Sequence, residues 1–314
     1  MSFAFVFPGQ GSQYVGMGQA LAASSRAAHA VWQTADEALG ESISTLAFTG
    51  PGDALNLTVN SQPAILACSI AYLRVIDERL DSLPAPTFYA GHSMGQYSSM
   101  VAAGVISLAD GVRLVRERGR QMQASAQDGS MAAVIGLPDD QLGALEAAGQ
   151  SLGVFTIANR NSPGQIVVSG ERAAVEGAAE KAKELGAKRA IVLPVSVGAH
   201  SPLMSTAAHN MREVLASVQF NDPSAPLLAN ADAHALTTAE DCRAELAEHL
   251  TRGVDWVKAV EVMSARRVGR FVEVGPGKVL TGLIKRINPE SEAVAVDEQS
   301  ATDRFAMPHF LTAS

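Results

Sequence analysis

Two kinds of hydrophobic pattern alternate along the chain. Short, almost continuous apolar runs are typical of strands buried on both faces, whereas apolar residues that recur every three or four positions are typical of amphipathic helices. The apolar runs over residues 4–7 (AFVF) and 87–90 (TFYA) are each followed by helical patterns, over 15–38 and 62–80 after the first run and from 94 and 108 after the second. This alternation predicts a parallel sheet covered by helices.

The same alternation resumes in the last part of the chain. It predicts, in chain order, a helix over 201–218, a strand over 226–230, helices over 240–250 and 254–266, a strand over 270–274, a helix over 278–287 and a strand over 293–296. The first and last parts of the chain are therefore expected to share one sheet.

The middle of the chain follows a different order. It predicts a strand over 131–137, a helix over 138–149, strands over 154–159 and 165–170, a helix over 171–185 and a strand over 188–196. The order β-α-β-β-α-β is ferredoxin-like. We therefore expect residues 128–197 to form a small inserted subdomain that divides a larger α/β domain made of residues 1–127 and 198–314.

Composition and charge exclude several classes of protein. Hydrophobic residues make up 47% of the 314 residues and charged residues 18%, which supports a packed core and argues against a disordered chain. The net charge of −8 gives no long-range attraction to nucleic acid or to an anionic membrane. No apolar run approaches the roughly 18 residues of a membrane span, and no basic residue precedes the first run, so we expect a soluble cytoplasmic protein.

The segment Gly91-His92-Ser93-Met94-Gly95 contains the pattern G-x-S-x-G. This pattern forms a sharp strand-to-helix turn, in which the glycines let two backbones approach and the serine stands above the sheet. A strand is predicted before it and a helix after it, so the N-terminal amides of that helix would face a developing oxyanion. Ser93 is the candidate nucleophile, and a tight structural turn is the alternative.

A serine nucleophile needs a general base, and His200 has the best position among the seven histidines. It follows the strand predicted over 188–196 through a short loop and precedes a helix start at Ser201-Pro202. Loops at the carboxyl ends of strands are where sheet-based enzymes place such groups. A capping or surface histidine is the alternative.

The helix predicted from 108 to 122 places Arg118 in its apolar sector when successive residues are turned by 100°. A guanidinium there needs an anion. It could form a structural ion pair with an internal Asp or Glu, or it could bind the carboxylate of a substrate through two hydrogen bonds.

The other glycine-rich segments do not support a nucleotide or metal cofactor. Gly9 and Gly11 are followed by Tyr14 where a dinucleotide loop needs its third glycine, and residues 275–278 (GPGK) lack the earlier glycine and the Ser or Thr of a phosphate-binding loop. Cys68 and Cys242 are too far apart for a zinc motif. We therefore expect neither a metal nor a redox cofactor.

Taken together, several segments resemble one enzyme family. They are residues 7–13 (FPGQGSQ), 91–98 (GHSMGQYS), 118–119 (RG), 161–165 (NSPGQ), 194–196 (PVS) with His200, and 273–278 (EVGPGK). In this order they resemble the malonyl-CoA:acyl-carrier-protein transacylases of fatty-acid synthesis, over residues 3 to about 288. The resemblance implies an α/β-hydrolase-like parallel-sheet domain with an inserted ferredoxin-like subdomain, which agrees with the pattern above.

The resemblance also implies a role for each site residue. Ser93 would attack the malonyl thioester and His200 would take its proton, while the backbone amides of Gln10 and Met94 hold the oxyanion and Arg118 binds the free malonyl carboxylate. Coenzyme A would leave, and the phosphopantetheine thiol of acyl carrier protein would then take the malonyl group from Ser93 in a ping-pong reaction. The partners implied are a coenzyme A thioester and acyl carrier protein, with no nucleic acid and no membrane, and we expect a monomer.

Three positions depart from the family pattern. Gln96 stands where the motif commonly has Glu, and Ala199 stands where malonyl-selective polyketide modules typically have Phe. His249 occupies the position of a family Gln whose backbone carbonyl orients the catalytic histidine, so we expect His249 to orient His200.

Alternatives to a fatty-acid enzyme remain. A free-standing acyltransferase of a polyketide assembly line would share the fold and the mechanism and could use a branched unit. A serine hydrolase would resolve the acyl-enzyme with water, and a non-catalytic module would only bind carrier protein, although the intact set of Ser93, His200 and Arg118 argues against the last.

Overall fold

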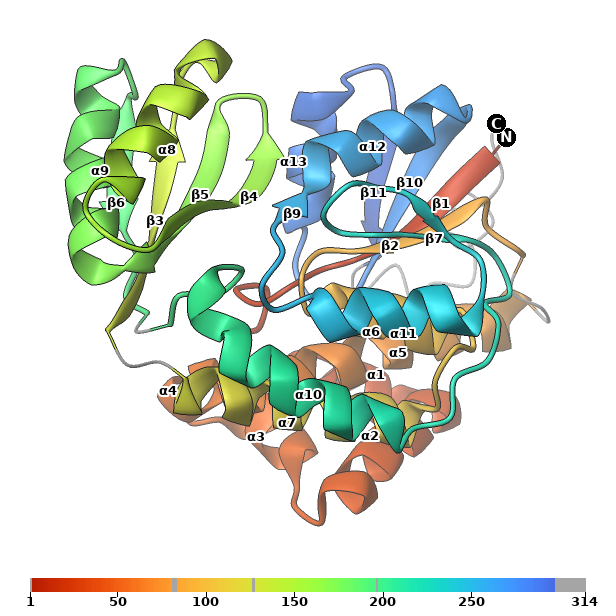
Figure 1. Cartoon of the computed structure of the whole chain (residues 1–314). Coiled ribbons are helices and arrows are strands. Elements are labelled where there is room, and N and C mark those ends of the chain that lie inside the picture. The colour runs from red at the N-terminus through yellow and green to blue at the C-terminus, as the bar shows by residue number, and fades with distance from the viewer. Residues whose placement is uncertain (1, 81–83, 126–127, 196, 297–314) are drawn as a thin grey trace.

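A computed structural model describes residues 2–80, 84–125, 128–195 and 197–296. The described chain forms two β-sheets with helices packed on them, one small and antiparallel and the other larger and mainly parallel (Figure 1). Ser196 and residues 297–314, which belong to the predicted 194–196 motif and to the predicted large domain, lie outside the described residues.

The larger sheet has the strand order β11-β10-β1-β2-β7-β8. Its neighbouring strands are parallel except for the pair β7 and β8. The strands are β1 (Ser2–Phe7), β2 (Phe88–Gly91), β7 (Leu227–Leu228), β8 (Ala235–Leu236), β10 (Val268–Val274) and β11 (Glu292–Val296). Because β1 lies between β10 and β2, the loops after β1, β2 and β10 leave the sheet at the same edge.

Side chains of β1 alternate between two hydrophobic cores, as the two-residue period of a strand requires. Phe3, Phe5 and Phe7 belong to a core with most of the helices, whereas Ala4 and Val6 face a second core with α12 (Trp256–Ala265) and α13 (Val279–Ile287). The sheet is therefore covered on both faces, which explains why β1 at its centre is an almost continuous apolar run.

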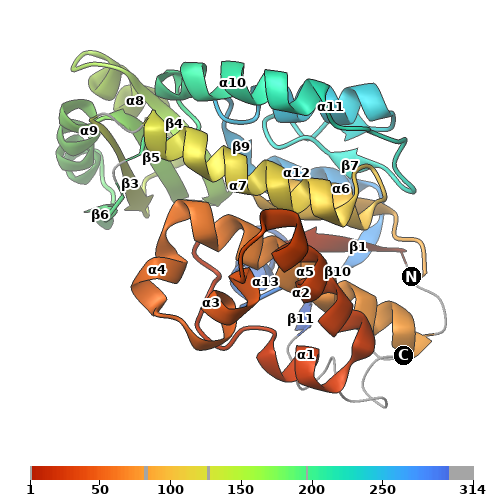
Figure 2. The same ribbon diagram turned by 90° about the horizontal axis from the view of Figure 1, so that it is seen from below.

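The first core contains the remaining helices of the larger part. They are α1 (Gln19–Ser24), α2 (Arg26–Leu39), α3 (Ile43–Thr49), α4 (Gly52–Asn56), α5 (Thr58–Leu80), α6 (Gly95–Ala102), α7 (Leu108–Ala124), α10 (Ser205–Ala216) and α11 (Ala239–Glu248). Figure 2 shows α7 between the group around α5 and the helices α10 and α11. Within the described ranges, no helix combines the length and the apolar character needed to cross a membrane.

The smaller sheet has the strand order β6-β3-β5-β4-β9. Its elements are β3 (Gly129–Ile135), α8 (Leu142–Gln150), β4 (Phe155–Ser162), β5 (Gln165–Glu171), α9 (Arg172–Glu184), β6 (Arg189–Val192) and β9 (Val254–Asp255). The pairs among β3, β4, β5 and β6 are antiparallel, with α8 and α9 against a core of their own. The edge strand β9 comes from the far end of the chain and runs parallel to β4.

Several element boundaries differ from the sequence expectation. The single helical pattern over 15–38 is divided by Ser25, which has an extended backbone and caps α2 by accepting a hydrogen bond from the Ala28 N–H. The helix expected over 254–266 begins at Trp256, because the two residues before it form β9. The strand expected over 188–196 is limited to Arg189–Val192, the stretch that pairs with β3.

Candidate active site

Ser93 lies on the turn between β2 and α6, with φ of 50°. The close approach of backbones around it explains the two glycines of the motif. A Cβ added at Gly91 would lie 2.1 Å from the backbone of Gly95, and one added at Gly95 would lie 2.2 Å from the Phe7 carbonyl oxygen. The turn therefore fits between β1 and β2 only without side chains at these two positions, and it exposes the serine at the carboxyl edge of the sheet.

His200 is hydrogen-bonded to Ser93 at 2.8 Å between Nε2 and Oγ. Its Nδ1 faces two backbone carbonyl oxygens, that of Arg252 at 2.8 Å and that of His249 at 3.1 Å. Since carbonyls only accept hydrogen bonds, Nδ1 must carry the proton, and Nε2 is the nitrogen that can take the proton of Ser93. This is the base, tautomer and orientation that a serine nucleophile requires.

Burial keeps His200 neutral. Its side chain is 3% exposed, and desolvation, followed by the positive charge of Arg118, lowers its pKa from 6.5 to about 3. The imidazole is therefore unprotonated near pH 7 and able to act as a base.

Arg118, from α7, lies beside the nucleophile and is 1% exposed. Its Nη2 donates to Ser93 Oγ at 3.1 Å and its Nη1 to the Gln62 side-chain oxygen at 2.9 Å, while its Nε has no hydrogen-bond partner in the described part of the chain. Burial lowers the pKa of Arg118, but an arginine remains charged in proteins. None of the ion pairs among the described residues includes Arg118, so the predicted alternative of a structural pair with an internal acid is not found there.

Gln10 and Met94, the two residues predicted to bind the oxyanion, lie in the loop after β1 and directly after Ser93 in the chain. Met94 directly precedes α6, so its N–H belongs to the unpaired first turn of that helix. Gln10 lies in the loop after β1, where its side chain donates to the Thr58 hydroxyl at 3.1 Å, and it lines the cavity described below. The Ser93 N–H is not available for this purpose, because it donates to the Asn230 side-chain oxygen at 2.9 Å.

His249 lies behind His200 and is 2% exposed. Its carbonyl faces His200 Nδ1, and its ring meets the ring of His200 edge-on at 5.6 Å between centroids. Burial lowers its pKa well below the usual value, so the ring is neutral. The Nδ1–H of His200 therefore faces backbone carbonyls and not the His249 imidazole.

Sequence reasoning missed Asn230, Arg252 and Gln62. Asn230 ends the apolar run over 226–230, and a polar residue at the carboxyl end of a strand was the available signal. Arg252 contributes only a backbone carbonyl to the site, for which side-chain chemistry gives no signal. Gln62 lies in α5, within a stretch from residue 61 to 73 that is buried throughout and otherwise mostly apolar.

A cavity of about 520 Å³ opens onto the dyad between the two sheets. Arg118 is the only permanently charged side chain among the described residues that line it, so the cavity favours an anionic ligand. The lining comprises Gln10, Gly11, Gln13, Asn56, His92, Ser93, Arg118, Met122, Met131, Asn159, Asn161, Val167, Leu193, Pro194, Val195, Val197, Ala199 and His200.

Comparison with known proteins places these features in a family. Residues 4–300 match the model of the acyl transferase domain. The chain is 46% identical over 302 residues to the malonyl CoA-acyl carrier protein transacylase of Escherichia coli K12, with 95% of this chain and 97% of that protein covered.

Solved structures agree. An acyl-carrier-protein S-malonyltransferase from Bartonella henselae superposes with a TM-score of 0.94 at 43% identity, covering 98% of this chain and 99% of that one. A malonyl-transacylase solved in complex with a type II PKS acyl-carrier protein gives a TM-score of 0.92 at 39% identity, with 98% and 100% covered.

Proposed function

The chain belongs to the malonyl CoA-acyl carrier protein transacylase family of acyl transferases, and we propose from this membership and the geometry of its site that it moves malonyl groups from malonyl-CoA to acyl carrier protein for fatty-acid synthesis. The observation that carries the proposal is a buried arginine without an acidic partner among the described residues, 3.1 Å from a serine that is hydrogen-bonded to a neutral histidine. A carboxylate on the acyl group is the chemistry that such an arginine would select.

In the first half-reaction, Ser93 Oγ attacks the thioester carbonyl carbon while its proton passes to His200 Nε2. The tetrahedral oxyanion accepts hydrogen bonds from the backbone N–H groups of Gln10 and Met94. The carbon–sulfur bond then breaks, His200 returns the proton to the coenzyme A sulfur, and the malonyl group remains on Ser93 as an ester.

The second half-reaction reverses these steps with another thiol. His200 takes the proton from the phosphopantetheine sulfur, the sulfur attacks the ester carbon, and Ser93 Oγ leaves and recovers the proton. Arg118 holds the malonyl carboxylate through both halves. Its departure from Ser93 Oγ toward the carboxylate would free the hydroxyl for attack.

The assembly that we propose has two parts. Residues 1–127 and 198–314 form an α/β-hydrolase-like catalytic domain and residues 128–197 a ferredoxin-like subdomain, with the acyl group bound between them. The strand β9 of the larger part extends the smaller sheet and supports a fixed arrangement. We propose a cytoplasmic monomer whose partners are a coenzyme A thioester and acyl carrier protein.

A branched extender unit for polyketide synthesis is the second candidate. Ala199 lines the cavity directly before His200, and its small side chain leaves space for a substituent on the acyl α-carbon. Comparing kcat/KM for malonyl-CoA and methylmalonyl-CoA would separate the two candidates.

The test of the main proposal is covalent malonylation of Ser93. Incubation with malonyl-CoA should add one malonyl mass to the wild-type protein, and holo acyl carrier protein should remove it. Ser93→Ala should show no adduct, because Ser93 combines the sharp strand-to-helix turn with a hydrogen bond to His200. An adduct that carrier protein cannot discharge but water can would identify a hydrolase instead.

A further inference from the structure

Asn230 is a buried side chain that joins two backbone groups of the nucleophile turn. It is 5% exposed, its Oδ1 accepts from the Ser93 N–H at 2.9 Å, and its Nδ2 donates to the Gly91 carbonyl oxygen at 2.8 Å. We propose that Asn230 is a positioning residue that holds Ser93 in its reactive conformation and leaves only the Met94 N–H of the turn for the oxyanion.

The orientation of the Asn230 amide is determined by its partners. A backbone N–H only donates and a carbonyl only accepts, so the atom facing Ser93 must be the oxygen and the atom facing Gly91 must be the nitrogen. The same reasoning applies to His249, whose Nε2 lies 3.3 Å from Asn230 Oδ1. His249 must therefore carry its proton on Nε2.

These two hydrogen bonds hold the backbone that leads into the residue whose conformation is least favourable for an L-residue. Ser93 has φ of 50°, in the left-handed region that non-glycine residues seldom adopt. One rigid amide therefore holds the peptide groups before and after His92, and the second of these carries the N–H of Ser93. Asn230 thereby fixes the direction of Ser93 Oγ toward His200.

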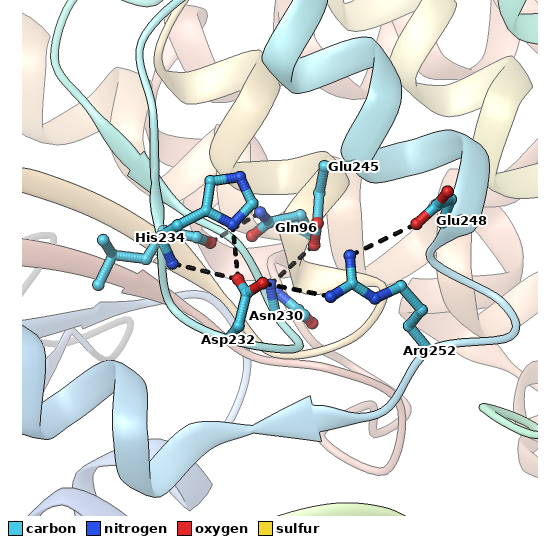
Figure 3. A network of polar contacts seen from close by, with 8 residues as sticks. Gln96, Asn230, Asp232, His234, Glu245, Glu248 and Arg252 are labelled. Atoms are coloured by element: carbon cyan, nitrogen blue, oxygen red, sulfur yellow. Dashed lines mark hydrogen bonds and ion pairs between the residues drawn. The ribbon is translucent and has the colours of Figure 1, made fainter.

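Asn230 is itself held from two sides. Its N–H donates to Glu245 Oε1 at 2.8 Å, and its carbonyl oxygen accepts from the Asp255 N–H at 2.7 Å. Figure 3 shows Asn230 with Glu245 and Gln96, beside the ion pairs that Arg252 makes with Asp232 and Glu248. The Gln96 side chain also connects α6 with β7, because it donates to the Leu228 carbonyl oxygen at 2.9 Å.

The position of Asn230 also explains how the two catalytic groups stay aligned. It follows β7, the strand next to β2, so its side chain reaches the turn that begins at the end of β2. Its Oδ1 is within reach of His249, and the carbonyl of His249 orients His200. One amide therefore contacts the nucleophile turn and the segment that supports the base.

The test measures formation of malonyl-Ser93 by rapid quenching and intact mass, and thus rests on the proposed function. Asn230→Ala should lower kcat about 100-fold with KM for malonyl-CoA changed by less than about threefold, since a displacement of about 1 Å costs that much and no group that touches the substrate is removed. Asn230→Asp, which has the same shape but lacks the donor to Gly91, should lose at least about tenfold. The control Asn288→Ala removes the side chain that bonds Ser264, away from the turn, and should keep kcat.

A second pair of variants loosens Asn230 without replacing it. Glu245→Ala removes the acceptor of the Asn230 N–H and should lower kcat about tenfold, whereas Glu245→Gln keeps an acceptor oxygen and should restore it. Equal kcat values for these two variants would overturn the proposal even if neither Asn230 variant folds. So would an Asn230→Ala protein that is less heat-stable but has unchanged kcat, because this is the behaviour of a merely structural residue.

Failure of the proposed function can be told apart from failure of this inference. A fluorophosphonate reacts with an activated serine hydroxyl through loss of fluoride and needs no malonyl group. Slower labelling of Ser93 in Asn230→Ala than in wild type would support the positioning role even if malonyl-CoA gave no adduct. Equal labelling rates would reject it.

Discussion

At the scale of single residues, the site combines a base without an acid partner and an arginine without an acid partner among the described residues. A carboxylate on His200 Nδ1 would raise its pKa, whereas the backbone carbonyls of Arg252 and His249 orient the ring and add no charge. Burial and the positive charge of Arg118 both lower the pKa of His200, and they outweigh the two backbone hydrogen bonds, which raise it. His200 therefore stays neutral, and the guanidinium of Arg118, which has no acidic partner among the described residues, can bind the acyl carboxylate as we propose.

His249 and His200 should respond differently to substitution. His249→Gln keeps the backbone carbonyl that faces His200, so its kcat should stay within about tenfold of wild type, while His200→Ala should lose at least roughly a thousandfold. Because the pKa of His200 is lowered to about 3, the imidazole remains able to accept a proton as the pH falls below 6.5. The acid limb of kcat/KM, measured over pH 4 to 8, should accordingly lie well below 6.5.

A folded His249→Gln protein as inactive as His200→Ala would make the His249 imidazole itself part of the chemistry. If His249 only fills space, His249→Ala should lower the melting temperature and leave the pH profile unchanged. The two variants together separate an orienting backbone from a reacting ring.

Arg118→Ala should distinguish malonyl from acetyl groups. Acetyl-CoA has no free carboxylate, so its transfer should change little, whereas malonyl transfer loses a hydrogen bond between charged groups of about 1.5–3 kcal/mol. The kcat/KM for malonyl-CoA should therefore fall at least roughly tenfold more than that for acetyl-CoA. Equal losses for both substrates would indicate that Arg118 supports the fold and not the acyl carboxylate.

At the scale of elements, the sequence predicts helices and strands that are long enough to show a hydrophobic pattern. It misses short elements that depend on a single tertiary contact. The strands β1 and β2 are short apolar runs, and the order of helices and strands along residues 129–192 is visible in the pattern. The helices α3 and α4 have seven and five residues, too few for a helical period to appear. The two-residue strand β9 exists only because β4 lies beside it, and no local pattern encodes such a pair.

The same distinction applies to the site. Ser93 lies in the G-x-S-x-G motif, and Arg118 lies on the apolar face of a predicted helix. Local sequence patterns are therefore enough to select both residues as candidates. Asn230 accepts a hydrogen bond from the Ser93 N–H, more than 100 residues earlier in the chain. Arg252 contacts His200, about 50 residues earlier, through its own backbone carbonyl. Their roles follow from which strands are neighbours, which a single sequence does not reveal.

The turn itself gives a prediction at this scale. Gly95→Ala would place a Cβ 2.2 Å from the Phe7 carbonyl oxygen, a clash between backbones that no side-chain rotation can relieve, so we expect a loss of about 3 kcal/mol or more in the free energy of unfolding. Gly143 is an exposed glycine of α8 with no atom within 4 Å of an added Cβ. Gly143→Ala should instead raise stability by about 0.5–1 kcal/mol. Urea unfolding of both variants measures the difference, and equal effects would contradict the geometry.

At the scale of the whole molecule, a net charge of −8 poses a problem for a partner that is itself acidic, as carrier proteins of this kind usually are. Local cations must then guide docking. From the sequence, Lys278, Lys285 and Arg286 around α13 are the candidates. Lys278 and Lys285 border a cavity of about 540 Å³, and neither takes part in an ion pair among the described residues.

Arg286 differs from the two lysines. Its Nη1 donates to Gln165 Oε1 at 2.6 Å, which connects α13 of the larger part with β5 of the smaller sheet. Reversal of its charge would therefore disturb the junction between the two sheets as well as any docking surface. The cleaner variants are Lys278→Glu and Lys285→Glu.

The double variant Lys278→Glu/Lys285→Glu should raise KM for carrier protein several-fold and leave KM for malonyl-CoA unchanged, because rim charges act on the encounter of two proteins more than on chemistry. The effect should shrink as salt is raised from 50 to 500 mM, since exposed charges are screened over a Debye length of about 10 Å or less.

Lys183→Glu, on the outer helix α9 of the smaller part, supplies a single reversal elsewhere on the surface and should change neither KM. If Lys183→Glu raised KM for carrier protein as much per charge as the α13 variants, the overall negative charge, and not a local surface, would control docking. A matching loss with both substrates would instead place the lysines at the coenzyme A site, where the phosphates of the donor would need the same cations.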